Sequence, residues 1–192
     1  MQQWFSSNGL PVVFVRDPGS TELGERLRAL VVGPARDKLG IAPWTEALLY
    51  TAARAQMAEE IIRPRLAAGA TVVCDRYVDS TLAYQGYGLG LPVDVLRTLS
   101  SQATGGLTPD CTLFFDVPPA IGLRRTTTGR RGNAEADRIE ARSLEFHQRV
   151  YEGYLALAAA EPGRWRIIPG DLPIEAAHAA VVEQLRILFR EV

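Results

Sequence analysis

The sequence predicts an α/β fold, in which parallel β-strands form a sheet with helices on both faces. Four short runs rich in β-branched and aromatic residues are long enough for buried strands, and longer stretches with helical periodicity separate them. Charged residues follow directly after three of these runs, as expected where a ligand-binding crevice lies beyond the carboxyl ends of parallel strands.

The first half of the chain supplies two of these strands. Thr21 has the side chain of an N-cap, and Pro64 is expected to kink the long helix that contains it. In chain order we expect a short helix over 1–8, a strand over Val12–Val15, a helix from Thr21 to about Val32, a loop over 33–43, a helix capped by Thr45 and reaching about Ala68, and a strand over Thr71–Cys74.

The second half supplies the other two strands. We expect a helix over Pro92–Ala103, a strand over Cys111–Phe115, a short helix over Pro118–Arg125, a polar loop over 126–137 that is too polar to pack, a helix over Ser143–Ala160, a strand over Trp165–Ile168 and a helix over Pro173–Arg190. Residues 1–192 contain no repeat or linker, which predicts a single domain. Four strands are few for this length, so the first strand and the front of the first helix are expected to be absent.

Composition narrows the classes of protein to which the chain can belong. The net charge of −1 gives no sign of an obligate nucleic-acid surface, and no apolar run is long enough to cross a bilayer. The two cysteines fall in predicted strands, where buried free thiols are the rule in a reducing compartment. We therefore expect a soluble cytoplasmic protein without a nucleic-acid or membrane partner.

Polar residues follow three of the predicted strands. Arg16 and Asp17 follow the first strand, Asp75 and Arg76 the second, and Asp116 ends the third. Any one of them could be ordinary turn chemistry. Their recurrence at several carboxyl ends favours one shared crevice, in which Arg76 would meet an anionic ligand.

Two groups of side chains are spaced to share a helix face. Thr81, Tyr84 and Gln85 stand at i, i+3 and i+4, and Tyr50 and Arg54 at i and i+4. A hydroxyl, aromatic rings, a carboxamide and a guanidinium fork can read a flat, hydrogen-bonding heterocycle. Taken alone, each group fits better with an ordinary salt bridge, a polar helix start or an amphipathic core helix.

The Arg- and Thr-rich stretch of about 126–138 has the composition of a lid over a polyphosphate. Arg130, Arg131 and Arg138 could neutralise charge that develops during phosphoryl transfer, although a solvated basic loop has the same composition. The two histidines, His147 and His178, lie in predicted helices without a second ligand at metal-binding spacing. No metal ligand is identifiable, and both histidines are expected to be surface or satisfied helical residues.

Taken together, these motifs resemble those of the bacterial thymidylate kinases. Arg16-Asp-Pro-Gly-Ser-Thr is similar to the family's Arg-Glu-Pro-Gly-Gly-Thr, and EALLYTAARAQ, from Glu46, is similar to its thymine-binding helix. DRYVDSTLAYQ, from Asp75, resembles the family's most specific stretch, and the similarity extends through TPDCTLFFDV and DRIE. It runs from about Gly9 to the C-terminus, with Asp17 for Glu, Ser20 for Gly and Tyr50 for Phe as small departures.

The resemblance implies a role for each of these positions. Binding of dTMP is implied for seven residues: Arg28 and Arg76 at the phosphate, Tyr50 stacked on thymine, Arg54 at its carbonyl edge, Thr81 and Gln85 reading the base, and Tyr84 shaping the sugar pocket. Catalytic roles are implied for four residues: Asp17, which would orient the acceptor side, and the lid arginines Arg130, Arg131 and Arg138. The activity implied is ATP- and Mg²⁺-dependent conversion of dTMP to dTDP for dTTP biosynthesis, by a homodimeric enzyme.

One departure from the family is large. The family opens with a strand, a Gly-x-x-x-x-Gly-Lys-Ser/Thr phosphate loop and a helix, but no such pattern occurs here, and the only lysine, Lys38, follows no strand. The expected fold is thus a P-loop-kinase-like parallel sheet between helices that lacks its first strand and phosphate loop, through truncation or a mis-started reading frame. That strand belongs in mid-sheet, so its neighbours should have unpaired or re-paired edges.

This departure leaves other functions open. A truncated, catalytically impaired thymidylate-binding relic or regulatory subunit is one alternative, and a kinase for another nucleotide is a second. Assays of ATP turnover and of a substrate panel distinguish these functions. The ATP-binding residues cannot be assigned from the sequence.

Overall fold

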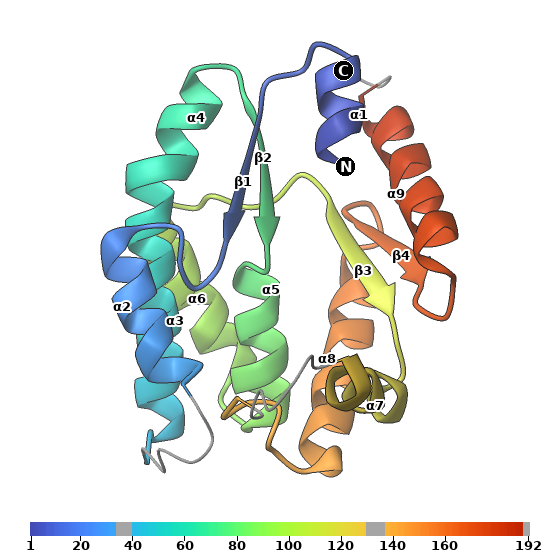
Figure 1. Ribbon diagram of the computed structural model, residues 1–192. Helices are drawn as coiled ribbons and strands as arrows, with labels where there is room; N and C mark the ends of the chain where they lie inside the picture. Colours follow the sequence, from blue (N-terminus) through green and yellow to red (C-terminus); the bar gives the residue numbers. More distant parts are fainter. Residues whose placement is uncertain (34–39, 130–136, 190–192) are drawn as a thin grey trace.

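The computed structural model describes residues 1–33, 40–129 and 137–189, and strands alternate with helices along these ranges (Figure 1). The strands are β1 (Val12–Arg16), β2 (Thr71–Asp75), β3 (Thr112–Asp116) and β4 (Trp165–Pro169). All four predicted strands are confirmed, and each limit falls within one residue of its predicted position.

The described helices are α1 (Gln2–Ser7), α2 (Glu22–Val31), α3 (Pro43–Met57), η2 (Ala58–Ile62), α4 (Arg63–Ala67), α5 (Val78–Thr81), η3 (Leu82–Gly88), α6 (Val93–Thr104), α7 (Pro119–Gly129), α8 (Leu144–Ala160) and α9 (Ile174–Leu188), where η marks π-helical segments. Thr21 caps α2 as predicted, because its side chain accepts a hydrogen bond from the Gly24 N–H at 2.9 Å.

Three helix predictions need correction. The long helix begins at Pro43 rather than at Thr45, because proline at a first helical position has no N–H to lose. The helix predicted to kink at Pro64 contains the π-helical segment η2 just before that residue, and Pro64 itself lies in the first turn of α4. Helix α7 continues to Gly129, so the loop predicted from residue 126 begins later than expected.

The four strands form two separate parallel pairs. β1 pairs with β2, with Val13 opposite Val72, and β3 pairs with β4, with Phe114 opposite Ile167. Figure 1 shows β2 and β3 pointing the same way, yet no strand pairing joins them within the described parts of the chain. The predicted parallel strands are confirmed, and so is the expected break in mid-sheet that leaves strand edges unpaired.

Helices cover both strand pairs and pack through three apolar clusters. One lies between η3, α6 and α8 and includes Leu82, Leu96 and Val150. The Cβ of an alanine at Gly153 of α8 would lie only 2.6 Å from the Tyr87 ring, so this glycine allows α8 and η3 to approach closely. This packing holds α8 against η3, the segment that carries Tyr84 and Gln85.

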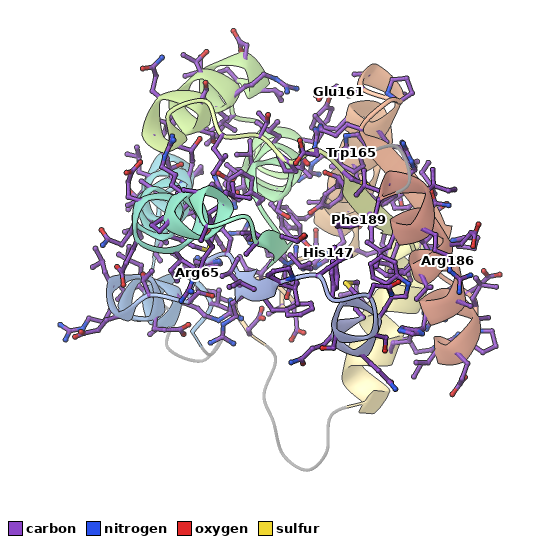
Figure 2. The ribbon with its side chains drawn as sticks, turned by 90° about the horizontal axis from the view of Figure 1, so that it is seen from above. Arg65, His147, Glu161, Trp165, Arg186 and Phe189 are labelled. Carbon is purple, nitrogen blue, oxygen red and sulfur yellow. The ribbon has the colours of Figure 1, made fainter. Side chains whose placement is uncertain are left out.

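A second cluster joins the two ends of the chain. Phe5 of α1 is fully buried with Val181 and Leu185 of α9. Phe189, labelled in Figure 2, lies just beyond α9. Its ring centroid is 5.7 Å from those of both Trp4 and Phe5. The third cluster packs β1 and β2 on α3 and η2, through residues such as Val15 and Met57.

Candidate active site at the ends of β1 and β2

Eight of the side chains singled out by sequence line one cavity beyond the carboxyl ends of β1 and β2. The cavity has a volume of about 180 Å³ and lies among α2, α3, α5, η3 and the start of α8. The eight are Asp17, Arg28, Tyr50, Arg54, Arg76, Thr81, Tyr84 and Gln85. The structure therefore brings together all seven residues predicted to bind substrate and one of the four predicted to be catalytic.

Asp17 and Arg54 form a buried ion pair in the cavity wall. Arg54 Nε donates to Asp17 Oδ2 at 2.6 Å, and the two side chains are 1% and 2% exposed. Arg54 Nη2 donates to Thr81 Oγ1 at 2.7 Å, which ties α3 to α5. Asp17 Oδ1 has no partner among the described residues, and burial raises the pKa of this carboxyl despite Arg54.

Arg28 and Arg76 give another part of the wall a positive charge. Arg76 follows β2 with a φ of 67°, a left-handed conformation that is strained for a side chain of this size. Its guanidinium lies over the Tyr84 ring at 5.2 Å, and Arg28 Nη1 donates to the Pro18 carbonyl at 3.0 Å. Burial alone would lower the pKa of Arg76, but Tyr84 and Tyr154 raise it above its usual value. Two permanent cations thus face the cavity, an arrangement suited to an anionic group.

The predicted base-reading residues lie on a helix that is only partly α-helical. Thr81 ends α5, whereas Tyr84 and Gln85 belong to the π-helical η3. Thr81 and Gln85 are 1% and 2% exposed but still line the cavity with Tyr84. Burial raises the pKa of Tyr50 well above its usual value, so its hydroxyl stays protonated near neutral pH.

The strand ends do not all reach this cavity. Asp116 accepts a hydrogen bond from the Tyr151 hydroxyl at 2.7 Å, and Arg16 pairs with Glu25 at 2.8 Å near the surface. The expectation of one crevice shared by all three strand ends is therefore wrong for β3. The reason is that β3 belongs to a strand pair separate from that of β2.

The predicted lid is described only in part. Arg130 and Arg131 lie outside the described residues. The Arg138 side chain is not part of the cavity lining: its Nη2 donates to Glu46 Oε2 at 2.6 Å, and its backbone N–H donates to the Gly33 carbonyl at 3.1 Å. Asp137 does line the cavity, and its Oδ1 accepts from two backbone N–H groups that follow it.

Three residues near the cavity were given no functional role from sequence. Ser80 and His147 line it, and Glu46 lies behind its wall, fully buried in the first turn of α3. His147 Nε2 is buried without a partner among the described residues, and burial lowers the pKa of the imidazole. The sequence gives no sign of a role for His147, whereas Ser80 lies within the DRYVDSTLAYQ motif and Glu46 opens the motif that resembles a thymine-binding helix.

The comparisons with known proteins agree with this arrangement. The thymidylate kinase family model matches residues 1–181. The chain is 48% identical to a thymidylate kinase of Roseiflexus sp. (strain RS-1), over 86% of this chain and 76% of that protein. It is 45% identical to one of Nostoc sp. (strain PCC 7120 / SAG 25.82 / UTEX 2576), over 98% and 88%.

Solved structures lead to the same family. The fold matches the crystal structure of thymidylate kinase from Ehrlichia chaffeensis with a TM-score of 0.73 and 28% identity, over 96% of this chain and 86% of that one. Sequence motifs, cavity, relatives and fold thus agree, and the chain belongs to the thymidylate kinase family.

Proposed function

We propose that this chain is a nucleoside monophosphate kinase that phosphorylates dTMP to dTDP with ATP. The observation that carries the proposal is that the proposed base-reading side chains and two arginines line one and the same cavity. Thymidylate kinase relatives that are 45–49% identical support the same activity. The activity requires a flat pyrimidine to be held in place while its phosphate is presented to the donor.

The proposed dTMP pose follows the chemistry of the cavity wall. Tyr50 provides a ring on which thymine stacks, and Arg54 and Gln85 provide polar groups for the edge of the base. Arg28 and Arg76 hold the phosphate by charge-assisted hydrogen bonds. Asp17 orients the acceptor side through its unpartnered oxygen, and the lid arginines Arg130 and Arg131 act at the transferring phosphoryl group. The third arginine predicted to be catalytic, Arg138, pairs with Glu46 instead.

We propose ATP with Mg²⁺ as the donor, as membership of the family implies. The sequence contains no Gly-x-x-x-x-Gly-Lys-Ser/Thr pattern to hold its phosphates. Nor do residues 1–33, 40–129 and 137–189 contain a group of three or more His, Cys, Asp or Glu side chains that could hold a metal ion. The described part of the chain therefore does not by itself supply the groups that would hold the phosphates of ATP and Mg²⁺.

Substrate binding and turnover are tested separately. Calorimetry with dTMP, dCMP and dGMP should give the highest affinity for dTMP, and preference for another nucleotide would overturn the proposed substrate. Residues 1–192 alone should form dTDP far more slowly than a relative that contains the Gly-x-x-x-x-Gly-Lys-Ser/Thr loop, because the donor phosphates lack this cradle. A chimera that adds a relative's first strand and phosphate loop before Met1 should raise both turnover and melting temperature. Fast turnover by residues 1–192 alone would mean that other residues hold the donor.

We also propose a cytoplasmic homodimer. In favour of a dimer, the helices beside the cavity expose large apolar side chains: Leu23, Leu30, Trp44 and Leu48 are each 41–51% exposed on α2 and α3. In favour of the cytoplasm, Cys74 and Cys111 are free thiols. None of the described helices is long and apolar enough to cross a membrane. Sedimentation velocity tests the dimer, for which a single monomeric species would be the contrary result.

A further inference from the structure

Glu46 is a fully buried carboxylate that joins three separate parts of the chain. It lies one helical turn before Tyr50 on α3 and is 0% exposed. Its Oε1 accepts from Gln85 Nε2 of η3 at 2.9 Å. Its Oε2 accepts from Arg138 Nη2 and from Arg142 Nη2, each at 2.6 Å. One carboxylate thus contacts both a cavity-lining amide and two arginines, one at the end of the lid and one just beyond it.

These contacts determine which end of the Gln85 amide faces the cavity. The Glu46 oxygens accept from two guanidinium groups and offer only acceptors to Gln85, so the nitrogen of Gln85 must point towards Glu46. Gln85 lines the cavity, and its Oε1 has no hydrogen-bond partner among the described residues. The cavity therefore meets the acceptor end of the amide, and the fully buried Glu46 prevents the amide from turning over.

We propose that Glu46 is a positioning residue for base selection. By fixing Gln85 as an acceptor, it makes the site select a pyrimidine whose ring presents an N–H donor and reject one whose ring presents a bare nitrogen. Thymine and uracil have this N–H at ring position 3, whereas cytosine has an acceptor there. The inference rests on the proposed function, since it concerns how the same site recognises the base of its nucleotide.

The variant Glu46→Gln reverses this orientation without changing the size of the side chain. The new amide oxygen would face the two arginines, because its NH₂ group would meet only donors there. The NH₂ group would then face Gln85, which must turn its own oxygen towards residue 46. As a result, Gln85 would present its NH₂ group to the cavity, and the site would favour an acceptor instead of a donor.

The test measures the affinities of dUMP and dCMP by calorimetry, because their bases differ only at ring positions 3 and 4. The unaltered chain should bind dUMP more tightly than dCMP. Glu46→Gln should lower the ratio of the two affinities by about tenfold or more, as expected when a buried hydrogen bond is exchanged for two facing donors. An unaltered chain without this preference contradicts the proposed substrate. A preference that Glu46→Gln leaves unchanged overturns the inference about Glu46 alone.

Two further variants separate base selection from a purely structural role. Arg142→Met removes one ion pair but leaves Glu46 as an acceptor for Gln85, so it should lower stability and keep the affinity ratio. The double variant Glu46→Gln/Gln85→Glu again places an acceptor towards the cavity and should restore the preference for dUMP. It also keeps one carboxylate in the cluster, which provides a test if Glu46→Gln alone does not fold. A double variant that does not prefer dUMP overturns the inference.

Discussion

Replacing Arg54 with alanine should lower the free energy of unfolding by about 3–5 kcal/mol, the usual cost of removing one partner of a buried ion pair. The substitution leaves the Asp17 carboxylate buried without its guanidinium at 2.6 Å, and Oδ1 has no other partner among the described residues. The Thr81 hydroxyl also loses the donor at 2.7 Å. Urea unfolding followed by circular dichroism measures the difference by linear extrapolation.

Arg26 provides a control with the same ion-pair distance but without burial. It contacts Glu22 at 2.6 Å with side chains that are 75% and 84% exposed, so Arg26→Ala should cost less than about 1 kcal/mol. The double variant Asp17→Asn/Arg54→Ala should be more stable than Arg54→Ala alone, because a neutral amide costs less to bury than an unpaired charge. Equal costs for the Arg54 and Arg26 variants, or a double variant no more stable than Arg54→Ala, would refute this reasoning.

Three further predictions follow from the same contacts. Arg76→Lys should weaken dTMP binding about tenfold, because lysine keeps the positive charge but loses the guanidinium fork that contacts the phosphate. Thymidine has no phosphate, so its binding should barely change. Equal weakening of both ligands in calorimetry would mean that Arg76 has only a structural role. Gly153→Ala should lower the free energy of unfolding in urea by about 1–3 kcal/mol, because its Cβ would lie 2.6 Å from the Tyr87 ring. The control Gly122→Ala, whose Cβ would have its nearest atom at 3.8 Å, should raise the free energy of unfolding by up to about 1 kcal/mol. A stabilising Gly153→Ala would argue against close packing of α8 on η3. Burial lowers the pKa of His147 below 6.5, so just below pH 6.5 the imidazole is protonated in the unfolded chain but not in the folded one, and the free energy of unfolding falls. His147→Gln should therefore reduce the loss of unfolding free energy measured between about pH 7.5 and about pH 5.5. An unchanged loss would contradict the lowered pKa.

Much of the fold could be predicted because its signals are local. A parallel strand covered on both faces is a continuous apolar run, and Thr71–Cys74 has this pattern within β2. The predicted start of α3 at Thr45 is wrong, because the helix begins at Pro43, and proline is well suited to a first helical position. The π-helical segments η2 and η3 could not be predicted, since one extra residue per hydrogen-bonded turn scarcely changes which residues are apolar.

The candidate site was predictable where spacing or motif placed its residues. Tyr50 and Arg54 lie one turn apart on α3, and both line the cavity as their spacing predicts. Glu46 was given no role, because its partners Gln85 and Arg138 lie 39 and 92 residues away in sequence. His147 was expected to be a surface or satisfied helical residue, and only packing shows that its Nε2 is buried at the cavity without a partner among the described residues.

The separation of the strands into two pairs affects how this protein unfolds locally. No β-ladder joins β2 to β3 within the described residues, so side-chain contacts hold the two halves together there, among them the ion pair between Arg164, just before β4, and Asp79 of α5 at 2.7 Å. Such a molecule can lose structure in stages, since β3, β4 and α9 can come apart without breaking the ladder between β1 and β2. Asp17 and Arg76 follow the β1–β2 ladder directly, so the strand ends that carry them belong to the half that can persist through such an opening.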